Sequence, residues 1–487
     1  MINNFLITLP AKIEKILKKI NINEHGLVFI VDKNKKLIGS ISDGDIRRSI
    51  LSGYNIKKTV FDKSKIVNKK IIYLKSDAKL INILKILNEG INGKKIKCIP
   101  LVDQKKRVVD ISTNQKTRRF PVAEPSIGEL EIKNIMQTLK TGWISSQGNY
   151  VTEFENLFKK YLGGGHCIAV SSGTTALQVA ISSLGLGRND EIVLPNFTFA
   201  ATINSIINAG CRPVLVDVEK ETWTINLNEI KKKITPKTKA IMPVHIYGQP
   251  YRIDEIKRFA QKKNLFVIED CAEAVGAIYK KRLVGLDPDV STFSFFANKT
   301  ITTGEGGMVV FRDKKIADKA RILINHGMSP KKKYYHDYVG HNFRMTNMQA
   351  AIGVGQIKRI NSLLRLRKKI FQNYDKAFKK FKLVELLPKN NWSTNSYWLY
   401  TLIINNINEI KRDMLIKRLI EKGIECRPGF GPLNLMKPYK KYSNGEYPVS
   451  KMLSFRTISL PTSDLTFLEQ NYIIKIFKQE VNFLKTK

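Results

Sequence analysis

The feature that most constrains the fold is a series of short apolar runs that alternate with longer segments of helical pattern from about residue 120 onward. Five of these runs are EIVLP (191–195), RPVLVDV (212–218), KAIMPVHIYG (239–248), LFVIEDCA (265–272) and GMVVF (307–311). Such runs are typical of strands buried on both faces, and helical segments between them indicate parallel neighbours. The sequence therefore predicts an α/β domain with a mainly parallel sheet covered by helices.

A longer periodicity follows this region. Apolar residues recur at positions 357, 360, 364, 371, 374, 378 and 381, the spacing of one long helix with an apolar face. We expect this helix to lead from the large domain into a smaller C-terminal domain. The predicted ranges are 118–378 and 379–487.

The N-terminal part contains a weak internal repeat. Residues 26–42, GLVFIVDKNKKLIGSIS, align with residues 97–113, KCIPLVDQKKRVVDIST. Each copy reads as a strand, a polar turn and a second strand. The polar, basic segment 111–121 ends in proline and is typical of a linker, so we predict a separate module over residues 1–117.

Charge and cysteine content narrow the class of protein. Among 487 residues, 83 are Lys or Arg and 42 are Asp or Glu, a net charge of +41. The basic residues are spread along the chain without a zinc-finger spacing, a helix-turn-helix pattern or a basic stripe with interleaved aromatics, so we expect no nucleic-acid partner. Anionic small substrates are compatible with the charge. The five cysteines form no CxxC pair, which favours reduced thiols and predicts no metal site.

The N-terminus and the apolar runs bear on the cellular location. The stretch MINNFLITLPAKIEKILKK lacks the basic n-region of a signal peptide. No apolar run approaches the roughly 18 residues of a membrane span. We therefore expect a cytoplasmic protein without membrane contact.

Three features of the α/β region together suit one cofactor. SSGTTAL (171–177) follows a strand-like run, and small residues at a helix start expose amides that favour phosphate. Asp270 ends another run at the sheet edge where ligands bind, although Asp is equally suited to cap a helix. Lys299 lies beside aromatic residues, where desolvation lowers the pKa of its amine and makes it a usable nucleophile or base. Pyridoxal phosphate requires a phosphate anchor, a pyridinium partner and an amine.

Residues 120 to about 465 resemble the DegT/StrS-type sugar-nucleotide aminotransferases, which are pyridoxal-phosphate enzymes of fold type I. The motifs occur in the family's order: GWISSQG (142–148), SSGTTAL (171–177), PNFTFAATINSI (195–206), PVHIYGQP (243–250), EDCAEAVGA (269–277), SFFANKTITTGEGGM (294–308), GHNFRMTNMQAAIG (340–353) and ECRPGFGPLNLMKPY (425–439). The resemblance implies a large, mainly parallel α/β domain that binds the cofactor and a small C-terminal α+β domain.

The resemblance also implies roles for single residues. Lys299 would bond to the cofactor as its Schiff-base amine and then shuttle a proton, and Asp270 would pair with the pyridinium nitrogen. Glu273 stands where many relatives have glutamine near the ring hydroxyl. The phosphate and the ring would be held by Gly173, Thr174, Ser294 and Phe199. For Ser294 an ordinary strand position and for Phe199 core packing remain alternatives.

Further residues are implied at the subunit interface and near the sugar. Asn342 would reach the phosphate in a neighbouring subunit, so the expected active unit is a homodimer or a higher homo-oligomer. Six residues lie in motifs that the family uses beside the substrate: Trp143, Ser145, Ser146, His245, Tyr247 and Arg427. For His245 a buried structural role is an open alternative.

The resemblance implies amino transfer, because relatives with histidine in place of Lys299 are sugar dehydratases. The family moves an amino group from L-glutamate to a nucleotide-linked keto-sugar. ANKTITTGEGGM most resembles members that aminate C4 of GDP-4-keto-6-deoxymannose to GDP-perosamine, a step in O-antigen and other polysaccharide biosynthesis. Transfer to UDP- or dTDP-linked 4-keto-sugars is an alternative, since those relatives have closely similar motifs.

The first N-terminal repeat ends GSISDGDIRR, and here the chain resembles a CBS-domain pair, a module that holds a nucleotide in many proteins. The resemblance implies that Ser42 and Asp45 contact the ligand. The aligned residues of the second copy are Thr113 and Lys116, so the acidic residue is missing there. A ligand-free docking or oligomerisation module and a nucleotide sensor with an aminotransferase-like scaffold remain alternatives.

Overall fold

The computed structural model describes residues 2–56, 60–61, 68, 70–78, 80–91, 96–113 and 120–485. Most of the predicted linker and Lys116 lie outside these residues. The chain divides into two compact units, Met1–Phe120 with Lys417–Glu425 and Pro121–Ile416 with Cys426–Lys487. Within the described ranges, every helix is too short or too polar to cross a membrane.

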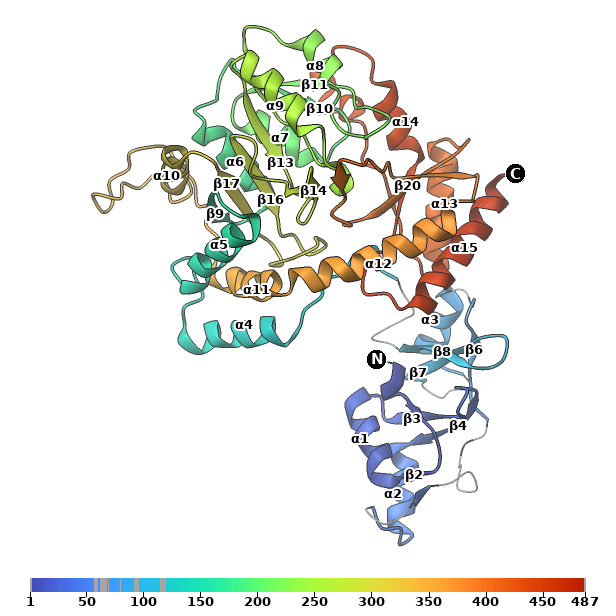
Figure 1. Cartoon of the computed structure of the whole chain (residues 1–487). Helices are drawn as coiled ribbons and strands as arrows, with labels where there is room; N and C mark the ends of the chain where they lie inside the picture. The colour runs from blue at the N-terminus through green and yellow to red at the C-terminus, as the bar shows by residue number, and fades with distance from the viewer. Residues whose placement is uncertain are drawn as a thin grey trace. The chain divides into compact units, whose positions relative to one another are not determined.

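The N-terminal unit contains two three-stranded sheets of the same design (Figure 1, blue). In each sheet a short parallel strand precedes an antiparallel hairpin whose register shifts before the last residue of the first hairpin strand. The first sheet has β1 (Leu6–Ile7), β3 (Leu27–Val31) and β4 (Leu37–Ser42), and the second has β6 (Leu74–Lys75), β7 (Cys98–Val102) and β8 (Val108–Thr113). The remaining elements are α1 (Ile13–Asn23), α2 (Asp43–Leu51), α3 (Leu80–Glu89), β2 (Ala11–Lys12) and β5 (Val60–Phe61). The sequence repeat is thus a structural repeat.

The turns of the two hairpins are bonded to each other. The Leu37 N–H donates to the Lys106 carbonyl at 3.0 Å, and the Val108 N–H donates to the Lys35 carbonyl at 2.8 Å. Lys35 and Lys106 are both left-handed, with φ of 62° and 58°. One hydrophobic cluster also includes residues of both copies, among them Phe29 and Val102. The two copies therefore share a core and cannot be separate domains.

The second unit is built on a seven-stranded sheet of order β11–β10–β12–β13–β16–β17–β9. All strands run parallel except β17, which is antiparallel to both neighbours, so the predicted mainly parallel sheet is confirmed. The bounds are β9 (His166–Val170), β10 (Glu191–Pro195), β11 (Arg212–Val216), β12 (Thr238–Ile241), β13 (Phe266–Asp270), β16 (Val290–Ser294) and β17 (Gly307–Phe311). β12 is shorter than the predicted run 239–248, because Pro243 lacks the N–H that would continue the ladder.

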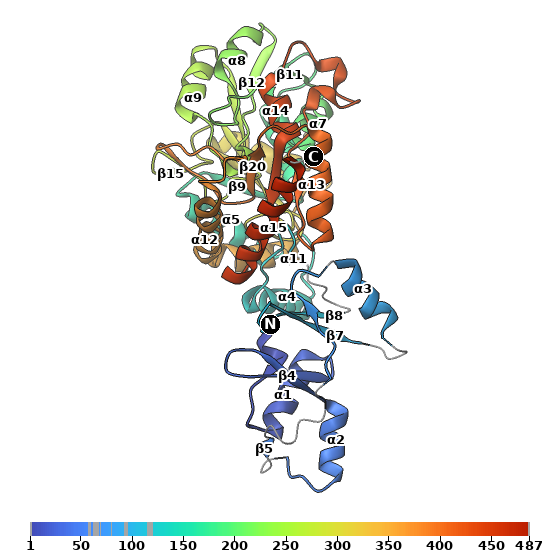
Figure 2. The ribbon, with the colours of Figure 1, turned by 90° about the vertical axis from the view of Figure 1, so that its right-hand side faces the viewer.

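Helices cover both faces of this sheet (Figures 1 and 2). One face packs against α6 (Gly173–Ser183), α7 (Ala200–Asn208) and α10 (Lys314–Leu323). The other packs against α5 (Asn149–Leu162), α8 (Leu227–Lys233), α9 (Ile253–Lys262) and α11 (Asn347–Lys358). Along β13, Ile268 belongs to the first core and Val267 to the second. The next residues alternate in the same way, so Asp270 and Glu269 face opposite sides.

The predicted single helix near residue 360 is two helices. α11 ends at Lys358 and α12 (Ile360–Phe378) begins after Arg359, whose φ and ψ are −114° and 13°. The Arg359 guanidinium donates to Ser126 and forms an ion pair with Glu131. The side chain at the break is thus held by a segment far away in the sequence, which a periodicity in one window cannot reveal.

The chain after α12 forms a four-stranded antiparallel sheet with helices, the predicted C-terminal α+β part (Figure 2, orange to red). Its elements are β18 (Val384–Leu386), β20 (Tyr400–Ile404), β21 (Arg427–Pro428), α14 (Pro448–Arg456), β22 (Thr457–Leu460) and α15 (Phe467–Lys485). The helix α13 (Glu409–Glu421) belongs to this unit as far as Ile416. The unit is completed by α4 (Glu129–Thr141) and a small sheet of β14 (Ile278–Tyr279), β15 (Arg282–Leu283) and β19 (Ser393–Thr394).

Candidate active site

The start of α6 lies against the end of β16. Gly173 is the first helical residue, and the Ser172 hydroxyl before it caps the helix by accepting from the Thr175 N–H at 3.1 Å. A Cβ on Gly173 would lie 2.7 Å from the Ser294 Cβ, so only glycine allows this approach. The structure therefore brings the predicted pair Gly173 and Ser294 together, with Thr174 exposed beside them. This is a small-residue helix start of the kind that binds phosphate.

Asp270 is the last residue of β13 and is 4% exposed. Its Oδ2 accepts from the Thr202 hydroxyl at 2.9 Å, and its Oδ1 accepts from the Ala272 N–H at 3.1 Å. Burial raises the pKa of the Asp270 carboxyl, against these two donors. A turn and not a helix follows, so the alternative of a helix cap is wrong. A buried, oriented carboxylate at the sheet edge suits a cationic partner.

Lys299 lies in the turn after β16. Its backbone N–H donates to the Phe296 carbonyl at 2.9 Å, and the turn is closed by the Thr302 hydroxyl, which donates to the Phe295 carbonyl at 3.0 Å. The Nζ atom lies 3.7 Å from the centroid of the Trp398 ring. Burial lowers the pKa of the Lys299 amine. The negative charges of Glu273 and Asp270 oppose that change.

Glu273 is buried near the same amine. Its Oε2 accepts from the backbone N–H of Tyr247 at 2.6 Å. Burial raises the pKa of the Glu273 carboxyl to about 7, and the charge of Asp270 acts in the same direction while that of Lys299 opposes it. Lys299, Asp270 and Glu273 therefore form one electrostatically linked group.

Aromatic rings flank this group. Tyr247 is stacked on Phe430, with centroids 5.2 Å apart and an interplanar angle of 1°, and on Trp398, at 6.3 Å and 18°. Phe430 also lies 5.8 Å from Phe199. Phe199 is 59% exposed, whereas the neighbouring Phe197 is buried in the core. The alternative of core packing for Phe199 is therefore wrong, and its ring is available to a ligand.

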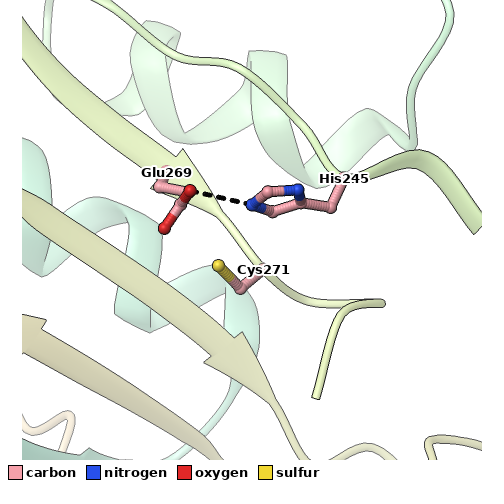
Figure 3. A group of neighbouring side chains, drawn as sticks. All are labelled: His245, Glu269 and Cys271. Carbon is pink, nitrogen blue, oxygen red and sulfur yellow. Dashed lines mark ion pairs between the residues drawn. The ribbon is translucent and has the colours of Figure 1, made fainter. Parts of the chain in front are cut away.

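The His245 side chain points toward Glu269 (Figure 3). Its Nε2 lies 2.9 Å from Oε1 of Glu269, and the side chains of both are 0% exposed. Ser291 donates to the other Glu269 oxygen at 3.0 Å, and the Tyr251 ring covers the imidazole at 4.8 Å. Cys271 completes a set of ligand-type atoms within 4.8 Å of one another, but burial raises the pKa of its thiol well above the usual range. The structure thus places His245 in the buried role that was its alternative.

The remaining predicted residues lie on the surface of the second unit. Asn342 accepts from Arg344 at 3.0 Å, and the adjacent Phe343 carbonyl accepts from the Ser171 N–H at 2.8 Å, which places this segment beside the start of α6. Arg427 is exposed in β21, and its charge lowers the pKa of Lys299. The predicted contact of Asn342 with a neighbouring subunit stays a prediction.

The loop 142–148 is tied to α11. Asn347 donates through its side chain to the Trp143 carbonyl at 2.6 Å and through its backbone to the Ser145 carbonyl at 2.8 Å. Trp143 exposes 59% of its surface, and Ser146 lines a cavity of about 200 Å³ together with Arg344. Their contacts with a sugar stay predictions.

The residues present fit pyridoxal phosphate. The Gly173–Ser294 approach leaves no room for a Cβ, Asp270 offers a buried carboxylate, and the half-buried Lys299 offers an amine whose pKa is lowered by burial. These are the three groups that this cofactor requires, and all belong to one unit. Sequence reasoning found each of them but missed Trp398, because its motif-free segment lies far from Lys299 in the chain.

The predicted nucleotide residues of the N-terminal unit bond to each other. The Ser42 N–H and hydroxyl both donate to Asp45 Oδ2, at 2.8 and 2.7 Å, and form a capping box at the start of α2. Asp45 Oδ1 accepts from Arg48 at 2.5 Å. Thr113 ends β8, and Lys116 lies outside the described residues. A nucleotide at Ser42 and Asp45 stays a prediction.

Comparison with known proteins gives matches to both parts of the chain. The model of the DegT/DnrJ/EryC1/StrS aminotransferase family matches residues 125–478, and that of the CBS domain matches residues 2–52. The GDP-perosamine synthases of Escherichia coli O157:H7 and Vibrio cholerae are each 40% identical over 344 residues, which are 70% of this chain and 93% and 94% of theirs. The putative sugar aminotransferase Spr1654 from Streptococcus pneumoniae, in its PMP form, has a TM-score of 0.71 and 28% identity, covering 76% of this chain and 99% of that one.

Proposed function

Because the chain belongs to the DegT/DnrJ/EryC1/StrS aminotransferase family and is a pyridoxal-phosphate-dependent sugar aminotransferase, we propose that it aminates C4 of GDP-4-keto-6-deoxymannose and forms GDP-perosamine. The amino donor is L-glutamate. The observation that carries the choice of sugar is the 40% identity to two enzymes named GDP-perosamine synthase, over at least 93% of their length. The pathway would be the synthesis of a surface polysaccharide.

The phosphate of the cofactor would be held at the start of α6. Gly173 and Thr174 offer the backbone amides of a helix N-terminus, where the helix dipole favours an anion, and the Ser294 hydroxyl lies against them. Phe199 offers an exposed ring for the cofactor, and Asn342 would complete the site of a neighbouring subunit. The active unit would then be a homodimer or a larger homo-oligomer.

Asp270 would hold a proton on the ring nitrogen of the cofactor. Pyridoxal phosphate, when bound, supplies an electron sink for the carbanion that forms at the carbon bearing the amine. Thr202 and the Ala272 N–H fix the Asp270 carboxylate, so its direction is set before any ligand arrives. A cationic partner would favour its ionised form, which burial disfavours in the chain alone.

Lys299 would serve as the amine that bonds to the cofactor and as the base that moves a proton at the substrate carbon. Its lowered pKa increases the neutral fraction, which is the form that attacks and accepts protons. Glu273, with a pKa raised to about 7, holds or releases a proton near neutral pH beside this amine. The two groups therefore adjust each other's charge.

The N-terminal unit would bind a nucleotide and tune the enzyme. The match of residues 2–52 to the CBS domain supports this role, with Ser42 and Asp45 as the proposed contacts. The proposed domain ranges are 1–117 for the CBS pair, 118–378 for the large domain and 379–487 for the small one. Coupling would require that a nucleotide changes turnover in the full chain but not in a chain with Asp45→Asn.

A substrate panel tests the sugar. The protein, loaded with pyridoxal phosphate and supplied with glutamate, is offered 4-keto-6-deoxysugars linked to GDP, UDP and dTDP, and the amino-sugar products are measured by mass spectrometry. We expect the highest kcat/KM with GDP-4-keto-6-deoxymannose. A higher kcat/KM with a UDP- or dTDP-linked sugar would replace this proposal with the corresponding alternative.

A further inference from the structure

The Lys299 amine rests on the face of a tryptophan that no motif indicates. The Nζ atom lies 3.7 Å from the centroid of Trp398, a residue that is 4% exposed. The indole N–H of the same side chain donates to the carbonyl of Asn298, the residue before the lysine, at 2.9 Å. Trp398 thus contacts both the amine and the backbone of the turn that carries it.

Trp398 is itself held in place from several sides. Its carbonyl accepts from the buried Arg367 guanidinium and from the Thr462 hydroxyl, each at 2.9 Å. Its ring is stacked on Tyr247, nearly parallel at 18°, and Tyr247 is stacked in turn on Phe430. Since its backbone is bonded and its ring is packed, the indole has a fixed direction and can fix that of the lysine.

The ring also bears on the charge of the amine. Burial and the charge of Arg427 favour neutral Lys299, whereas Glu273 and Asp270 favour the ammonium. The face of an indole attracts a cation, and this attraction grows when the pair is shielded from water. The Trp398 ring therefore favours the ammonium form of Lys299, as the two carboxylates do.

We propose that Trp398 is a positioning residue for amino transfer: its ring face fixes the direction of the Lys299 amine, and its N–H fixes the turn that bears the lysine. The inference rests on the proposed role of Lys299, but the contact exists in the chain itself and can be tested before any cofactor is added.

Two variants separate the ring face from the N–H. Trp398→Phe keeps an aromatic face and removes the N–H. Trp398→Met fills much of the same space but has neither an aromatic face nor an N–H. Trp392→Met is the matched control, because the Trp392 ring also meets a cation, Arg252 at 5.4 Å, without contacting Lys299. Thermal unfolding of each variant shows whether the fold is kept.

The primary measurement is the ionisation of Lys299 in the cofactor-free protein. Competitive acetylation across a pH series, followed by peptide mass spectrometry, gives the pKa of each lysine separately. We expect Trp398→Met to lower the pKa of Lys299 by about one pH unit, the size of a shielded cation–ring contact. Trp398→Phe should keep most of the wild-type value, and Trp392→Met should keep all of it.

Turnover gives the second readout. With the cofactor bound, Trp398→Met should lower kcat several-fold more than it changes the KM for glutamate, and Trp398→Phe should restore most of the loss. Two results would overturn the role of the ring face. One is the same Lys299 pKa in Trp398→Met and the wild type, and the other is an equal fall of that pKa in both Trp398 variants. If Trp398→Met does not fold, the Phe variant decides, since a lowered pKa there is contrary to the proposal. If the pKa shifts occur as expected but the protein aminates no sugar, the proposed function is wrong and the contact of Trp398 with Lys299 still holds.

Discussion

Lys36 and Arg107 pair with each other in an antiparallel bridge that joins the two hairpin turns of the N-terminal unit. Each turn is also closed by its own aspartate: Asp32 Oδ1 accepts from two backbone N–H groups at 2.8 Å, and Asp103 Oδ1 accepts from two at 2.9 Å. The same turn occurs twice and each copy is the bonding partner of the other. The two turns therefore stabilise each other.

This pairing predicts that damage to the two turns is not additive. Asp32→Ala and Asp103→Ala should each destabilise the unit by about 1 kcal/mol, because each leaves two backbone donors without their acceptor. The loss of stability in the double variant should differ from the sum of the two single losses by about 0.5 kcal/mol or more, as expected for sites that share partners. Hydrogen exchange of β4 and β8 measures both effects locally. Asp43→Ala, which removes an exposed ion pair with Arg47, serves as the control, and strict additivity would mean that the turns act independently.

Replacing Lys299 should remove covalent attachment of the cofactor. Lys299→Ala is expected to lose the visible absorption that the protein gains with pyridoxal phosphate, and borohydride treatment should no longer fix the cofactor to the peptide that contains residue 299. Lys280→Ala removes an amine that is paired with Asp254 outside the site and should keep both signals. Persistent attachment in Lys299→Ala would show that another lysine carries the cofactor.

Gly173 should be needed for cofactor affinity. The added Cβ of Gly173→Ala would lie 2.7 Å from the Ser294 Cβ and force the helix start away from β16. We expect a loss of at least about tenfold in affinity for pyridoxal phosphate, or about 1.4 kcal/mol, measured by fluorescence titration. Gly187→Ala is the control, since its nearest contact would be 4.0 Å away. Similar affinities of the two variants would place the phosphate elsewhere.

Glu273 should make the cofactor-free protein less stable as the pH rises. Its pKa is about 7 in the folded chain against the ordinary glutamate value of 4.5, so between these values the unfolded chain releases a proton that the folded chain keeps. The free energy of unfolding should then fall by up to about 3 kcal/mol as the pH rises from 4.5 to 7. Glu273→Gln should remove this part of the slope.

Urea unfolding of the wild type and of Glu273→Gln at pH 5 and pH 7.5 measures the difference. Because only the difference between the two proteins is compared, titrating groups that do not interact with Glu273 cancel, and Lys299 is the group whose pKa changes with the substitution. Parallel stability profiles would mean that Glu273 is ionised in the folded chain throughout this range.

The sequence predicts the parts of the site that depend on strand ends. Asp270 and Ser294 are the last residues of β13 and β16, where an apolar run stops at a polar residue. It does not predict what lies across the site, because the ring that touches Lys299 belongs to the run YWLYTLII, which reads only as a buried strand. His245 was open to two interpretations, and the packing of Tyr251 and Glu269 around it decides for the buried one.

The break between α11 and α12 was missed for a related reason. Neither glycine nor proline stands at residue 359, and the side chain of Arg359 is directed to Glu131 and Ser126, which no local window contains. Contacts between remote segments thus set both the bend of a helix and the surroundings of the lysine.

The stack of Trp398, Tyr247 and Phe430 draws its rings from both sides of α12. Tyr247 and Lys299 come before that helix, while Trp398 and Phe430 follow it. A chimera that takes its C-terminal part from a relative, in order to accept a different sugar, would therefore import a new neighbour for the amine as well. The basicity of the lysine in this protein therefore depends on residues from both sides of α12.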